Sequence, residues 1–145
     1  MKTLKHCKKL CTKWCNIFDF RAPKIHYTPN ISIMGFLAYF SASDYSITVS
    51  DNFLKLEEYE FYLHLFHELG HAYYLHHYKT IKQKIKAEKQ AEKFALKQLK
   101  KYFPLYYFQI IPCRKSLLKT LKKVHKKYVH LQPHYYAYKQ IKEYR

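Results

Sequence analysis

The chain has 145 residues, of which 27 are Lys or Arg and 10 are Asp or Glu, so its formal net charge is +17. This length is typical of one compact domain, and with 48% hydrophobic and 19% aromatic residues the chain can bury a core, which excludes a wholly disordered basic tail. No stretch reaches the apolar length of a membrane span, and no apolar segment of a signal peptide follows the basic N-terminus, so we expect a cytoplasmic protein.

The first predicted element is an amphipathic helix within residues 2–18, whose apolar positions recur with helical spacing. Cys7, Cys11 and Cys15 lie on this stripe, one helical turn apart. That spacing is poorly suited to a disulfide and lacks the paired short spacings of a zinc finger. Reduced cysteines that pack a helix face are the favoured interpretation; a redox site or a second metal site is the alternative.

A β-rich stretch follows. Strands are predicted at residues 25–28, 33–40 and 45–50, and the turn at residues 41–44 makes the last two a hairpin. Residues 45–50 alternate as a half-buried strand does.

The remainder of the chain is predicted to be largely helical. A long buried helix is expected over residues 55–77, with acidic side chains at its start, and a second helix over residues 80–101, which Phe103 and Pro104 end. Residues 106–111 are aromatic and receive no assignment, residues 116–129 predict a basic amphipathic helix, and residues 133–145 form a Tyr-rich tail. The predicted inward side chains of the helix over residues 116–129 are Leu117, Leu118, Leu121, Val124 and Tyr128.

These elements predict a single α+β domain over residues 1–145. A small antiparallel or mixed sheet of about three strands packs on an active-site helix and a glutamate-bearing helix, with amphipathic helices at both ends. The core of the metal site described next spans about residues 45–101, and the basic helix and Tyr-rich tail occupy residues 114–145.

The most informative motif is His67-Glu68-Leu69-Gly70-His71, an H-E-x-x-H sequence within the predicted buried helix. Histidines four residues apart lie about 40° apart around a helix axis, so both imidazoles can bind one metal ion. Glu68 lies beside them, where it can take a proton from a metal-bound water. The structural alternative is a pair of core histidines bonded to the backbone.

A catalytic zinc needs a third protein ligand. His77 has the spacing used by the metzincins, but a glycine is required three residues after the second histidine, and Tyr74 stands there. In a continuous helix, His77 would lie about 120° around the axis from His71 and about 9 Å along it, which is out of reach. His77 and His76 are therefore weak candidates.

Two glutamates on the next helix are stronger candidates. Glu88 and Glu92 lie in phase with its inward positions, one turn apart, whereas the lysines, including Lys84, lie off that stripe. Because a buried carboxylate is costly unless it is paired or metal-bound, we predict Glu88 as the third zinc ligand. Glu92 is placed to accept a hydrogen bond from a ligating imidazole. Pairing of both glutamates with lysines on a surface helix is the alternative.

The motif H-E-L-G-H, followed by Glu88-Lys-Gln-Ala-Glu92-Lys-Phe-Ala95, resembles the gluzincin metallopeptidases, most closely the ImmA/IrrE-like group, and is also similar to the minigluzincins. The resemblance spans about residues 45–99. It implies a zinc peptidase in which His67, His71 and Glu88 bind one Zn²⁺ and Glu68 is the general base. Glu92 stands where Asp is usual, which adds a methylene.

The resemblance also implies a protein or peptide substrate, and a transcriptional repressor is one possibility. However, the helix-turn-helix that many ImmA/IrrE-like relatives carry is missing from this chain. We expect the substrate to add a strand at an edge of the sheet, for which the candidate residues are Phe36, Leu37, Ala38, Tyr39 and Phe40. His134, Tyr135 and Tyr136 are candidates for stabilising the oxyanion. His64, one turn before His67, is interpreted as packed or as supporting a ligand.

Two other functions remain open. A DNA-associated protease similar to the SprT-like group would need a third ligating His, and no Gly-His element follows His71 to supply it. A basic nucleic-acid-associated protein with a structural zinc would need a closed four-ligand site. Latency, with the tail from Pro133 covering the cleft, is a further possibility.

The basic charge is almost entirely lysine. Only Arg21, Arg114 and Arg145 are arginines, although arginine is the side chain that best matches phosphates and guanine edges. The lysine excess fits an A+T-rich coding sequence equally well. Nonspecific affinity for nucleic acid is therefore predicted only as a secondary property.

Overall fold

The structure is a computed structural model, and it describes residues 1–29 and 37–141. Its helices and strands are as follows: α1 (Leu4–Ile17), β1 (Lys24–Tyr27), β2 (Ala38–Ser41), β3 (Ser46–Val49), α2 (Asp51–Leu54), α3 (Glu58–Tyr73), α4 (Ile81–Tyr102), α5 (Pro104–Val124), the short 3₁₀ helix η2 (Val129–Leu131) and α6 (Gln132–Lys139). The predicted α+β class is confirmed. None of the helices in the described residues is long and apolar enough to cross a membrane.

The sheet is small and mixed, with strand order β1-β3-β2. The predicted hairpin is confirmed, because β2 pairs with β3 in antiparallel register, while β1 pairs with β3 in parallel register. All four residues of β3 are buried. The prediction of a half-buried strand there is wrong because β3 is the central strand, covered on both faces. Residues 33–36 of the predicted second strand lie outside the described residues.

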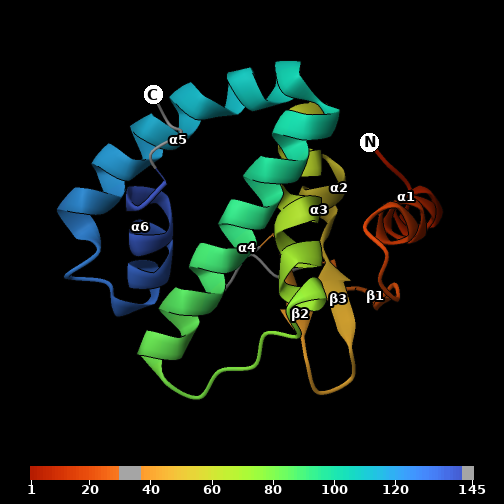
Figure 1. Ribbon diagram of the computed structural model, residues 1–145, viewed down its shortest axis with the longest axis horizontal. Coiled ribbons are helices and arrows are strands. Elements are labelled where there is room, and N and C mark those ends of the chain that lie inside the picture. Colours follow the sequence, from red (N-terminus) through yellow and green to blue (C-terminus); the bar gives the residue numbers. More distant parts are fainter. Residues whose placement is uncertain (30–36, 142–145) are drawn as a thin grey trace.

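The helices form the larger part of the molecule. In Figure 1, α3 lies beside the sheet, α4 crosses between α3 and α6, and α5 runs along one end of the helices. Trp14 joins α1 to the other helices. The centroid of its ring lies 5.0 Å from that of Phe66 of α3 and 5.1 Å from that of Tyr102 of α4. Cys7, Cys11 and Cys15 are buried free thiols in this core, in agreement with their interpretation as packing residues.

The helix predicted over residues 55–77 differs from the structure at both ends. The chain forms the short α2 first, and α3 begins only at Glu58. At its C-terminus α3 stops at Tyr73, because Leu75 takes the left-handed conformation with φ 51°. The Leu75 N–H bonds to the Ala72 carbonyl at 3.1 Å and the His76 N–H bonds to the His71 carbonyl at 2.9 Å, which is the Schellman arrangement. Glycine is the usual residue in this conformation. Because leucine stands here instead, the turn could not be predicted from the sequence.

The C-terminal region is more helical than predicted. Phe103 ends α4 as expected, but Pro104 at once begins α5, since proline suits the first turn of a helix. The predicted helix over residues 116–129 therefore starts too late and ends too late, and residues 106–111 are helical. Leu121 of its predicted inward set is buried, whereas Leu117 and Tyr128 are 39% and 44% exposed. The predicted tail contains α6, which buries Pro133, Tyr135, Ala137 and Tyr138, and residues 142–145 lie outside the described residues.

The contact between α3 and α4 is close because Gly70 has no side chain. A Cβ built at Gly70 would lie 3.1 Å from the Cα of Ala91, 3.2 Å from its carbonyl oxygen and 3.2 Å from a ring carbon of Phe94. Two of these three neighbours are backbone atoms of α4. A larger residue must therefore move the two helices apart.

We expect Gly70→Ala to lower the free energy of unfolding by about 1–2 kcal/mol, because overpacking outweighs the better helix propensity of alanine. Urea denaturation measures the change, with Lys97→Ala on the exposed face of α4 as the control. An increase in stability would show that α3 and α4 tolerate a wider separation.

Candidate metal centre

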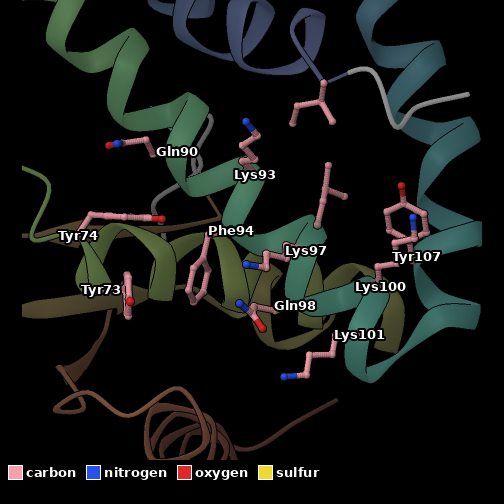
Figure 2. Close-up of a pocket in the computed structure, with 12 residues that line it drawn as sticks. Tyr73, Tyr74, Gln90, Lys93, Phe94, Lys97, Gln98, Lys100, Lys101 and Tyr107 are labelled. Carbon is pink, nitrogen blue, oxygen red and sulfur yellow. The ribbon is translucent and has the colours of Figure 1, made fainter.

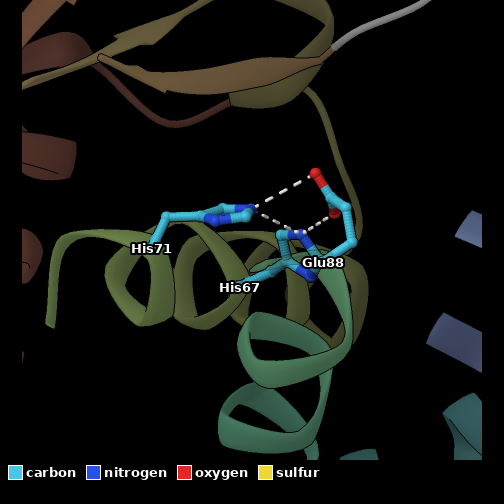
Figure 3. A group of neighbouring side chains, drawn as sticks. All are labelled: His67, His71 and Glu88. Carbon is cyan, nitrogen blue, oxygen red and sulfur yellow. Dashed lines mark hydrogen bonds and ion pairs between the residues drawn. The ribbon is translucent and has the colours of Figure 1, made fainter. Parts of the chain in front are cut away.

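Three side chains from α3 and α4 meet at one point. His67 and His71 lie one turn apart on α3, and Glu88 faces them from α4 (Figure 3). The Nε2 atom of His67 lies 2.9 Å from Oε2 of Glu88 and 3.2 Å from Nε2 of His71, which lies 3.5 Å from Oε1 of Glu88. One donor atom from each residue lies within 4.8 Å of the others, and all three residues are buried. This group could hold a metal ion.

The charges in this group are arranged to favour a cation. Burial favours the neutral forms, but the hydrogen bonds to Glu88 and Glu92 raise the pKa of His67 well above its usual value. Burial would raise the pKa of Glu88, but the hydrogen bonds from His67 and His71 hold it well below its usual value. A positive charge at the imidazole of His67 is thus stabilised by the two carboxylates.

The outer nitrogen of His67 is held by a buried ion pair. Nδ1 of His67 lies 3.0 Å from Oε2 of Glu92, and Nε of Arg114 donates to Oε1 of Glu92 at 2.7 Å. The guanidinium of Arg114, from α5, also lies 4.3 Å from the ring centroid of Tyr138 of α6. Burial alone would raise the pKa of Glu92, but the charge of Arg114 and the hydrogen bond from His67 lower it to about 2. Glu92 therefore contacts an imidazole as predicted, and it does so as a carboxylate.

The outer nitrogen of His71 is held by His76, which in turn contacts Gln90. Nδ1 of His71 lies 2.8 Å from Nδ1 of His76, and Nε2 of His76 lies 2.8 Å from Oε1 of Gln90. The turn at Leu75 makes this contact possible because it reverses the chain directly after α3. His76, considered in the sequence only as a weak ligand candidate, thus supports His71 from behind, while His77 is exposed.

Glu68 lies on the wall of a cleft beside the three donors. The cleft has a volume of about 370 Å³ and is lined by β2, by the metal group, and by His76, Tyr78, Lys84 and His134. Burial raises the pKa of Glu68 above its usual value, which the nearby His71 and His67 partly offset. A second cavity of about 250 Å³ shares four wall residues with the first: Ala38, His67, Glu68 and His134. The two hollows therefore meet at Glu68, alongside strand β2.

The candidate substrate strand lies in part at this cleft. Ala38, Tyr39 and Phe40 line the first hollow, and Leu37 and Ala38 line the second. As β2 stands at the edge of the sheet β1-β3-β2, its position suits strand addition. Phe36 lies outside the described residues.

Of the three oxyanion candidates, the structure brings His134 to the cleft. Its Nδ1 atom lies 3.9 Å from Oε2 of Glu88, and burial lowers the pKa of this imidazole. Tyr135 is instead buried against the ring of His125, with the centroids 3.8 Å apart, and neither Tyr135 nor Tyr136 lines the two hollows. His64 lines the second hollow, outside the metal group, where burial lowers its pKa to about 3.

Sequence reasoning missed three features of this site. Arg114 is buried and is one of three arginines in a chain whose basic residues are mostly lysine, and this choice of residue was its sequence signal. The role of His76 depends on the turn at Leu75, which has no glycine signature. Lys84 lines the cleft, although the stripe placed it on the solvated side, because it lies one turn before Glu88 on the same face of α4.

Comparisons of the chain with protein-family models, with curated proteins and with solved structures returned no match.

We expect His76→Ala to weaken metal binding about 10- to 100-fold, because Nδ1 of His71 loses the group that fixes its orientation. Competition with a chelator measures the affinity, and His76→Gln, which keeps a hydrogen-bond acceptor, should recover part of it. The neighbouring exposed His77→Ala serves as the control. Equal affinities for the two alanine variants would contradict this role of His76.

Arg114→Met should lower the free energy of unfolding by about 3 kcal/mol, because it leaves the carboxylate of Glu92 buried without its cation. Adding Glu92→Gln removes the uncompensated charge, so the double variant should be more stable than the single one. Urea denaturation of both, beside the exposed neighbour variant Lys115→Met, measures these changes. A double variant less stable than Arg114→Met would contradict the pairing.

Proposed function

We propose that the chain is a zinc-dependent metallopeptidase, similar to the gluzincins, that hydrolyses peptide bonds with Glu68 as the general base. The observation that carries the proposal is the convergence of His67, His71 and Glu88 beside a cleft that Glu68 also lines. Two imidazoles and one carboxylate are a donor set typical of catalytic zinc.

The donor count favours a catalytic site over a structural one. Within residues 1–29 and 37–141, three donor groups form the cluster, whereas a structural zinc is held by four. Glu88 supplies the third donor, where the SprT-like arrangement would use a histidine. The adjoining cleft provides room for a water molecule and a substrate.

A zinc ion held there would supply a Lewis acid that polarises the scissile carbonyl and activates water. The carboxylate of Glu68 would accept the proton of that water and pass it to the leaving amine, a role that its raised pKa supports. His134, facing the same cleft, is placed to stabilise negative charge on the carbonyl oxygen. The edge of β2 would hold the peptide in an extended form.

Glu68→Gln should keep its zinc and lose at least about 99% of hydrolysis, since removing the base costs about 10²-fold or more. Zinc content by elemental analysis and cleavage of a mixed peptide library measure both properties. Glu60→Gln, earlier on α3, is the matched control. Full cleavage by Glu68→Gln would contradict its role, and a zinc-loaded wild type that cleaves nothing in the library would contradict the peptidase assignment.

Glu88→Ala should lose zinc, because only two ligands remain, and with it any hydrolysis. Glu57→Ala, at the exposed start of α3, is the control for the loss of one carboxylate. Retention of a full zinc equivalent by Glu88→Ala would show that the third ligand lies elsewhere.

A further inference from the structure

A third hollow is lined mainly by α4 and by the C-terminal end of α3, and it shares no lining residue with the two that meet at Glu68. It is a groove of about 790 Å³, larger than either hollow beside Glu68. Figure 2 shows its lysines along α4 and two tyrosines at the end of α3. We call it the lysine–tyrosine groove and define it by Tyr73, Tyr74, Phe94, Lys93, Lys97, Lys100 and Lys101.

The charged side chains that line this groove within residues 1–29 and 37–141 are all positive. Lys93, Lys97, Lys100 and Lys101 are its charged lining residues, and all four are exposed. Their spacing puts them along one side of α4 over about 12 Å. In the part of the chain that the structure describes, none of the four lies in an ion pair, so their charge is available to an anionic partner.

The aromatic rings of the groove are accessible yet fixed. Tyr73 and Tyr74 are each 46% exposed. The ring of Tyr73 stacks on Phe94 with centroids 5.3 Å apart, and the ring of Tyr74 stacks on His76 at 5.4 Å. The two tyrosines also contact each other edge to face at 5.0 Å. Rings held in this way offer a platform for another flat group at little cost in side-chain entropy.

We propose that the lysine–tyrosine groove binds single-stranded nucleic acid, with phosphates along the lysines and bases against Tyr73 and Tyr74. A positively charged groove combined with exposed aromatic rings is the arrangement that binds single strands without sequence preference. A groove of this size can take a few unstacked nucleotides, and among the described residues no arginine lines it to read base edges. An acidic peptide would use the lysines and leave the rings unused. The inference goes beyond the proposed peptidase activity and does not depend on it.

The first test separates this groove from the general basic charge. Fluorescence anisotropy of the full chain with labelled (dT)₂₀ and (U)₂₀ compares the triple variant Lys93→Gln, Lys97→Gln, Lys100→Gln with Lys119→Gln, Lys122→Gln, Lys123→Gln on the exposed face of α5. The groove variant should bind at least about tenfold more weakly, with a salt slope smaller by about 2, and the α5 variant should bind within about twofold of wild type. Equal losses in both variants would overturn the proposal. The more tightly bound strand identifies DNA or RNA as the source.

The second test addresses the rings. Tyr74→Leu should weaken binding about tenfold and Tyr74→Phe should leave it unchanged, since stacking needs the ring and not the hydroxyl. Gln90 is left intact because it also bonds to His76. Duplex DNA of matched length should bind more weakly, and polyglutamate should compete poorly. The proposal would be overturned by wild-type affinity in Tyr74→Leu or by tight binding of the duplex. It would also be overturned if polyglutamate displaced the labelled strand as effectively as unlabelled strand does, and that result would indicate an acidic peptide as the partner.

Discussion

The close approach of α3 to α4 at Gly70 is the constraint on which the site depends. Gly70 lies between the two histidines of the motif, and the backbone of Ala91 touches it from between the two glutamates of α4. The same contact therefore sets both the separation of the helices and the separation of the imidazoles from the carboxylates. Residues that move the helices apart would act on stability and on the donor geometry together.

That contact forces two carboxylates into the interior, and the surrounding structure balances them. Glu88 faces both imidazoles, whereas Glu92, with no solvent exposure, faces one imidazole and the guanidinium of Arg114. The cation comes from α5, so a helix distant from α3 in sequence completes the charge balance. The four-helix arrangement of α3, α4, α5 and α6 is in this sense part of the site, because α6 also supplies His134 and the ring beneath Arg114.

The part of the site that lies on regular helices could be predicted from local sequence patterns. The H-E-x-x-H spacing and the inward phase of Glu88 and Glu92 predicted the donors, because helix periodicity alone decides which side chains share a face. Features that depend on non-local contacts or unusual backbone were not predictable in this way. Leu75 adopts a left-handed conformation without the glycine that usually marks it, and this turn brings His76 behind His71. The partnership of Arg114 with Glu92 depends on how α5 crosses α4, which no local spacing encodes.

The basic surface takes on a more specific meaning in this fold. Most lysines lie on outer helix faces, where they can be explained by composition alone. Those near the C-terminus of α4 differ because a concave surface and the rings of Tyr73 and Tyr74 accompany them. Net charge attracts any polyanion, whereas aromatic rings beside it favour flexible strands whose bases are free to stack. The combination of a concave surface, four lysines and two exposed rings, rather than the total charge, is thus what the proposed binding depends on.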